Sequence, residues 1–263
     1  MSPMDENRDF EDYGKESLKY GDKAAKLPNE LIIPGLSSGK DPKKAKERAA
    51  SSGYFVVVVA DGYPNIYQSD SDEIAAANAG LHLWMPSSID FLQTALRATG
   101  GNEENILKVA SEKEFFEKLA NFKGNIQRLM IIAHGTKGGI GFSGTEFEGS
   151  KSYLNIDVLN KKDNLDKVKK IKAKLLANSR IDLVACNSGA DPNFSQAFKI
   201  TFGVTVYGFN VPVNWILRWS VDKETKEKSI IPAEHRGLVF LVTNSKNKPI
   251  IYFDPKKMPF RKL

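Results

Sequence analysis

The sequence predicts an α/β protein with a mainly parallel sheet, helices on both faces of that sheet, and a β-rich C-terminal extension. Between residues 54 and 209, short apolar runs alternate with amphipathic segments of helix length, the pattern of parallel strands joined by crossover helices. After about residue 214 the helical segments cease and only short apolar runs remain. We therefore expect an N-terminal arm at 1–50 and one α/β domain over 51–263, with the β-rich tail beginning near 214.

The composition is that of an ordinary soluble globular protein. The chain has 263 residues, of which 41% are hydrophobic and 27% charged. Its apolar runs fall short of the roughly 20 residues that a membrane helix needs, and its first residues lack the layout of a signal peptide. The single cysteine, Cys186, permits no internal disulfide. We expect a cytoplasmic, reducing location and no membrane span, with delivery into a host cell as an open alternative.

The first half of the chain opens with an arm that we interpret as basic and partly disordered, with its basic run at 40–48. The continuous apolar run at 54–59, which contains four β-branched valines, is typical of a buried parallel strand. It ends at the turn Asp61-Gly62-Tyr63-Pro64. The next elements predicted are a short helix at 74–79, a helix from Ser87 or Ser88 to 98, a strand at 106–109, a helix opened by a capping box at 111–114, and a strand at 128–133.

The second half continues the alternation. Beyond Gly135 we expect a mobile glycine-rich loop, a lysine-rich helix at 163–177, a strand at 181–185, a helix at 193–202 and a strand at 204–209. The tail then contains predicted strands at 215–221, 238–243 and 250–253. The polar segments at 223–228 and 244–248 look like hairpin turns.

Two of the predicted strands each end in a reactive side chain, His134 and Cys186. They are 186 − 134 = 52 positions apart, the length of one crossover between parallel neighbours. A parallel α/β sheet binds its ligands beyond the carboxyl ends of its strands, and an imidazole there raises the thiolate fraction of a cysteine, which makes it a nucleophile. Gly135 has no Cβ, so a substrate carbonyl can approach; its N–H and that of Cys186 form the predicted oxyanion site.

These motifs resemble the clan CD cysteine peptidases: caspases, legumain, gingipains, clostripain and the self-cleaving domains of bacterial toxins. The shared signature is an apolar strand ending in His-Gly and a later one ending in Ala-Cys, here Leu-Met-Ile-Ile-Ala-His134-Gly135 and Ile-Asp-Leu-Val-Ala185-Cys186. The resemblance covers about 54–210. It implies a caspase-like fold and a cysteine endopeptidase (a thiol protease) that cleaves a protein or peptide substrate, including itself. In that reading His134 is the general base or acid and Cys186 is the nucleophile.

The sequence also departs from the caspase pattern. Val184 stands where caspases have Gln, and Gly189 comes one position late. The segment around Cys186 is closer to bacterial toxin and effector members. Other interpretations remain open: an effector-type Cys-His acyltransferase or deamidase, a catalytically inactive interaction module of the same fold, or a dyad that uses His235.

The end of the first strand is expected to line the substrate pocket through Asp61, Gly62 and Tyr63. The Asp61 carboxylate there favours a basic side chain before the scissile bond, although an aspartate that only caps the turn fits equally well. From the β-rich tail, Trp215 is a candidate pocket wall, with a place in the core as its alternative.

No cofactor is expected, because one cysteine and three scattered histidines do not have the spacing of a zinc site. The formal charge of +6 suggests an anionic partner. Lys167, Lys170 and Lys174 lie along one edge of the lysine-rich helix. By resemblance to toxin-borne members they suggest activation by an inositol phosphate, with a solvated face as the alternative. Nucleic acid is not expected, since no aromatic platform accompanies the lysines.

Overall fold

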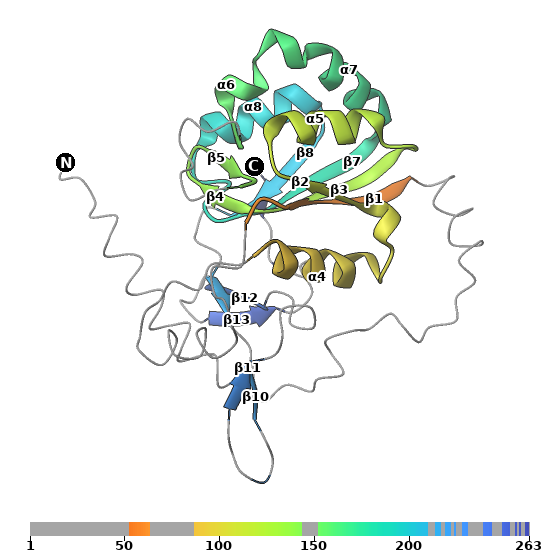
Figure 1. The fold of residues 1–263 in the computed structure, drawn as a ribbon. Helices are drawn as coiled ribbons and strands as arrows, with labels where there is room; N and C mark the ends of the chain where they lie inside the picture. The colour runs from red at the N-terminus through yellow and green to blue at the C-terminus, as the bar shows by residue number, and fades with distance from the viewer. Residues whose placement is uncertain are drawn as a thin grey trace, which may run out of the picture.

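The computed structural model describes residues 53–63, 87–143 and 152–209, together with short strands and single residues between 214 and 262. Its centre is a five-stranded parallel sheet in the order β2-β1-β3-β7-β8, with β14 added antiparallel to β8 (Figure 1). The strands are β1 Tyr54–Ala60, β2 Ile106–Val109, β3 Ile126–Ile132, β7 Leu175–Val184, β8 Thr205–Gly208 and β14 Arg261–Lys262. The predicted α/β class and mainly parallel sheet are confirmed.

The strand order places a topological switch point at β1. The chain crosses from β1 to β2 on one side and then returns to place β3 on the other side, with both pairs parallel. In open α/β sheets the crevice outside the carboxyl ends of the strands at such a point is where ligands bind. The carboxyl ends of β1 and β3 are therefore the place to look for a site.

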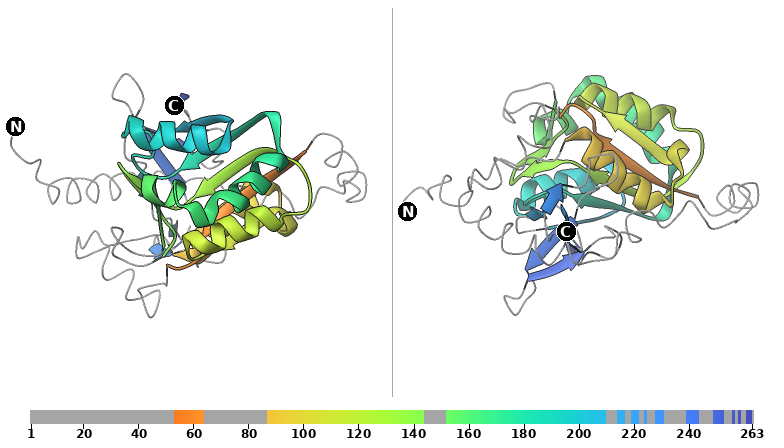
Figure 2. Two further views of the ribbon diagram at one scale, coloured as in Figure 1. Left: turned by 90° about the horizontal axis from the view of Figure 1, so that it is seen from above. Right: turned by 60° about the horizontal axis from the view of Figure 1, so that its bottom comes forward.

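Helices cover both faces of the sheet, as predicted. On one face α4 (Ser88–Thr99) packs against β1 and β2. On the other face lie α5 Glu112–Asn121, α6 Ile156–Leu159, α7 Leu165–Lys174 and α8 Pro192–Phe202 (Figures 1 and 2). Two short 3-10 helices, Glu103–Asn105 and Lys162–Asn164, complete the helical elements of the described ranges.

The core lies between these layers. β1 is buried without interruption over residues 56–60 because helices cover both of its faces. On the α5 side the core is rich in phenylalanine, with Phe115, Phe116, Phe194 and Phe198 all fully buried. Each such side chain stabilises the fold by roughly 1.5–3 kcal/mol relative to exposure.

Two predicted element boundaries are wrong. The lysine-rich helix ends at Lys174 instead of 177, and Leu175 already belongs to the ten-residue strand β7, where it pairs with Ile126. The predicted strand at 181–185 is the second half of β7. The glycine-rich segment after the third strand begins as an antiparallel sheet, β4 His134–Thr136, β5 Gly139–Gly141 and β6 Tyr153–Asn155, where a loop was expected.

The tail is β-rich, as expected. β9 (Asn214–Ile216), β12 (Val239–Thr243) and β13 (Pro249–Tyr252) form a small antiparallel sheet. β10 (Trp219–Val221) pairs with β11 (Lys228–Ile230). The strands on either side of both predicted turns pair antiparallel, while the turns lie almost wholly outside the described residues. The strand predicted at 215–221 is two strands, and Lys228 belongs to β11. The arm at 1–50 and the helix at 74–79 lie outside the described residues. Within the described ranges, no helix has the length and apolar character to cross a membrane.

Candidate active site

His134 and Cys186 lie opposite each other at the ends of neighbouring strands. Ile132 pairs with Val184 in the β3–β7 ladder, and the N–H of Ala133 donates to the carbonyl oxygen of Val184 at 3.3 Å. This hydrogen bond closes the end of the ladder. His134 and Cys186 each follow two residues later, after bends at Ala133 and Ala185. The proximity predicted from their spacing is confirmed for the backbone.

Gly135 makes a close backbone contact with Cys186. A Cβ on Gly135 would lie 2.4 Å from the carbonyl oxygen of Cys186, 2.9 Å from its nitrogen and 2.8 Å from the Cβ of Ala185. Only glycine leaves room for this approach of two backbones. The two residues predicted to supply the oxyanion amides are thus in direct backbone contact.

The imidazole of His134 packs against two aromatic rings that also contact each other. His134 is 8% exposed. Its ring centroid lies 4.4 Å from that of Tyr63 and 5.3 Å from that of Phe91, with interplanar angles of 70° and 82°. These are edge-to-face arrangements of the kind that aromatic pairs prefer. Since Phe91 belongs to α4, the His134 side chain lies on the α4 face of the sheet.

The turn after Cys186 is held by a buried serine. Asn187 has a φ of 52°, a left-handed conformation that asparagine adopts more readily than most residues. Ser188 is fully buried; its hydroxyl donates to the carbonyl oxygen of Leu183 at 3.2 Å and accepts from the N–H of Phe209 at 3.3 Å. The turn that carries the half-buried Cys186 is therefore tied to the end of β7 and to the residue that follows β8.

The carboxyl end of β1 lies beside those of β3 and β7, so three neighbouring strands end at this edge of the sheet. Asp61 is exposed, and its N–H donates to the carbonyl oxygen of Val109 at 2.7 Å. The N–H of Gly62 donates to the carbonyl oxygen of Phe142 at 3.0 Å. A Cβ on Gly62 would lie 1.8 Å from that of Ser143, so this position too requires glycine. Asp61 thus lies at the end of the strand that neighbours the strand of His134.

Tyr63 and Trp215 were also predicted at the pocket, but the structure describes the side chain of Tyr63 only. Tyr63 is 6% exposed, burial raises the pKa of its hydroxyl well above the usual range, and that hydroxyl has no hydrogen-bond partner in the described part of the chain. What the structure shows for its ring is a packing contact with His134. The backbone of Trp215 pairs with Phe240 of β12, and its side chain lies outside the described residues.

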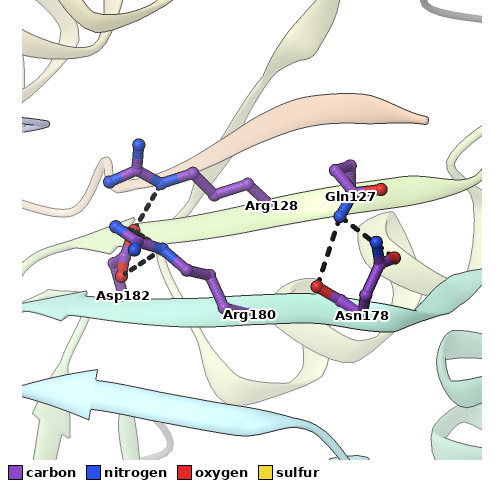
Figure 3. Close-up of polar contacts among 5 residues, drawn as sticks. All are labelled: Gln127, Arg128, Asn178, Arg180 and Asp182. Carbon is purple, nitrogen blue, oxygen red and sulfur yellow. Dashed lines mark hydrogen bonds and ion pairs between the residues drawn. The ribbon is translucent and has the colours of Figure 1, made fainter. Parts of the chain in front are cut away.

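Asp182 has a structural role that the sequence did not reveal in detail. Figure 3 shows it between two arginines: Arg128 Nε lies 2.5 Å from Oδ2, and Arg180 Nε lies 3.1 Å from Oδ1. The guanidinium groups lie over the rings of Phe55 (5.3 Å) and Tyr207 (4.9 Å). Asp182 is four residues before Cys186, about 13 Å along the strand. It is an ion-pairing carboxylate of the sheet and not a third member of the site.

The lysines of α7 do not converge on one point. Lys167 Nζ lies 3.4 Å from Glu117 Oε1, and Lys174 Nζ donates to the carbonyl oxygen of Phe122 at 2.7 Å. Their helix covers the face of the sheet opposite to α4 (Figure 1). The anionic activator remains a prediction. Among the described residues, no three His, Cys, Asp or Glu side chains gather in a way that could hold a metal ion.

Phe91 and Ser188 are the site residues that the sequence analysis missed. Phe91 carries only the general signal of an apolar residue at the start of a helix, and Ser188 makes a contact 21 residues along the chain. Comparison with protein-family models and with curated proteins finds no match to this chain.

Proposed function

We propose that this protein is a cysteine endopeptidase of caspase-like architecture in which His134 and Cys186 form the catalytic dyad. The observation that carries the proposal is the direct backbone contact of Gly135 with Cys186 at the carboxyl ends of β3 and β7. This contact lies beside the topological switch point of the sheet, where α/β proteins build their sites. A thiol and an imidazole brought to that edge are the minimum set for acyl transfer.

In the proposed reaction Cys186 Sγ attacks the carbonyl carbon of the scissile peptide bond while His134 takes the thiol proton. The carbonyl oxygen becomes an oxyanion, which the N–H groups of Gly135 and Cys186 stabilise. The C–N bond then breaks, the amine leaves with the proton held by His134, and a thioester on Cys186 remains. Water, deprotonated by His134, hydrolyses the thioester and regenerates the thiol.

For specificity we propose that Asp61 selects a basic side chain before the scissile bond. Asp61 is exposed at the end of β1, which neighbours β3, the strand that leads to His134. A carboxylate at this edge attracts the positive charge of a substrate lysine or arginine. The basic run at 40–48 would then be the place of self-cleavage. Asp61→Asn should lower labelling by an arginyl electrophile more than labelling by a leucyl one.

The proposal is tested with a peptidyl acyloxymethyl ketone that has arginine next to the reactive group. We expect one adduct, mapped by peptide mass spectrometry to Cys186, and its loss in His134→Ala. An unmodified Cys186, or equal modification with and without His134, counts against the dyad. N-terminal sequencing of the purified wild type beside Cys186→Ala tests self-processing, since only the wild type should show a new terminus within 40–48.

The same dyad would also serve an acyltransferase or a deamidase, so the products decide between reactions. A host lysate treated with the wild type and with Cys186→Ala is compared by mass spectrometry. New peptide termini that require Cys186 support proteolysis, whereas mass shifts on intact chains assign the dyad to group transfer. No difference between the two treatments favours the inactive interaction module.

A further inference from the structure

We propose that Tyr63 and Phe91 form an aromatic clamp that positions the imidazole of His134. The catalytic part of this inference rests on the proposed function; the structural part does not. The two rings come from different elements, Tyr63 from the segment after β1 and Phe91 from α4. They meet each other edge-on at 5.9 Å and meet His134 at 4.4 and 5.3 Å.

The backbone of Tyr63 is itself held in place. The N–H of Tyr63 donates to the Ser88 hydroxyl at 3.0 Å, and that hydroxyl donates to the carbonyl oxygen of Tyr63 at 3.0 Å. The N–H of Ser88 donates to the same oxygen at 2.9 Å. Three hydrogen bonds therefore tie the first residue of α4 to Tyr63, and they fix the distance between the two halves of the clamp.

Phe91 is fixed by the cap of α4. The Asp90 carboxylate accepts from both the N–H and the hydroxyl of Ser87, at 3.0 and 2.9 Å, and Asp90 is fully buried. The N–H of Phe91 donates to the carbonyl oxygen of Ser87 at 3.1 Å, and the Phe91 side chain is fully buried. A buried ring next to a closed cap has little freedom to move, so it sets the plane of the imidazole that it contacts.

The consequence for the reaction is geometric. A catalytic base must meet its proton within hydrogen-bond reach, and a misplacement of about 1 Å costs on the order of 100-fold in rate. Leucine in place of either aromatic residue keeps the site apolar but removes the ring that makes the edge-to-face contact with the imidazole. We expect Phe91→Leu and Tyr63→Leu to lower the maximal rate of Cys186 alkylation by roughly 10- to 100-fold, with little change in the concentration of electrophile that half-saturates the reaction.

The matched control is Phe198→Leu. Phe198 is also a fully buried phenylalanine, but it lies on α8 at the opposite face of the sheet. Urea melts should show a similar loss of stability in Phe91→Leu and Phe198→Leu, with only the former slowed in alkylation. Tyr63→Phe restores the ring and should return most of the rate lost in Tyr63→Leu. Equal rates in Phe91→Leu and Phe198→Leu overturn the clamp.

A second measurement is independent of catalysis. The imidazole Hε1 resonance of His134, identified by its loss in His134→Ala, should lie away from the usual range because two aromatic rings contact the imidazole. It should move in Phe91→Leu and hold its place in Phe198→Leu. A resonance that holds its place in both variants overturns the clamp whatever the activity. If the wild type shows no alkylation that depends on His134, the proposed function fails, and the resonance alone decides the structural part.

Discussion

Gly135→Ala is the substitution for which the structure allows the most definite prediction. The added methyl would lie 2.4 Å from the carbonyl oxygen of Cys186, whereas ordinary contact begins at 3.4 Å. The backbones must therefore separate by about 1 Å, because the neighbouring atoms belong to the backbone of Cys186 and to the Ala185 Cβ and not to a flexible side chain. Overpacking of this kind costs about 1–3 kcal/mol. At roughly 2–4 °C per kcal/mol for a chain of this size, Tm should fall by about 2–12 °C.

The same displacement separates the strand ends that carry His134 and Cys186. A shift of about 1 Å is expected to slow alkylation of Cys186 by about 100-fold. Gly138→Ala is the matched control, because a methyl there meets nothing closer than the Tyr153 hydroxyl at 3.8 Å. Thermal melts and alkylation rates of the two variants are compared with those of the wild type. The reasoning is refuted if Gly135→Ala melts and reacts like Gly138→Ala.

Three further predictions concern stability, each measured by urea unfolding. Tyr63→Phe should raise the free energy of unfolding by roughly 1 kcal/mol near pH 7, since the hydroxyl it removes is buried with no partner in the described part of the chain. Burial raises the pKa of Tyr63, so the folded wild type holds the phenol proton more tightly than the unfolded chain does. The free energy of unfolding of the wild type should therefore be unaffected by this group below about pH 10 and fall by about 1.4 kcal/mol per pH unit above it. Tyr63→Phe should show a shallower alkaline loss, and an identical slope would contradict the assignment. Asp182→Asn should cost about 1.5–3 kcal/mol because the fully buried carboxylate loses its bonds to two partly exposed arginines, whereas Asp166→Asn, in an exposed pair, should cost about 0–1 kcal/mol; similar losses would contradict the burial argument. Ser188→Ala should cost about 1–3 kcal/mol because the buried hydroxyl makes two hydrogen bonds, to the carbonyl oxygen of Leu183 and from the N–H of Phe209, and a loss below that range would contradict its role in holding the turn.

The parts of the fold that the sequence predicts well are those with a strong local signal. The apolar run at 54–59, with its four valines, is typical of a buried strand, and the serines at 87–88 and 111 marked the starts of α4 and α5. The boundary at Leu175 could not be predicted in this way, because a leucine there suits the apolar stripe of a helix as well as a buried strand. Pairing with Ile126, 49 residues earlier, decides for the strand.

In the candidate site too, the features with a local sequence signal could be predicted and the long-range contacts could not. The spacing of His134 and Cys186 equals one crossover, so their positions at adjacent strand ends could be predicted. The rings that contact His134 could not, because Tyr63 and Phe91 meet it through tertiary packing. The hydrogen bond between Ser188 and Phe209 is likewise a long-range contact, and no local sequence pattern predicts it.

The most direct test of the central claim is the rate of Cys186 alkylation in the wild type and in His134→Asn, which keeps a polar side chain at the position. A general base contributes about 10²- to 10⁴-fold. The wild type should therefore react at least about 100-fold faster than His134→Asn with a peptidyl electrophile. In 8 M urea the two proteins should react at the same rate. Rates within about twofold of each other in the folded proteins would contradict the dyad.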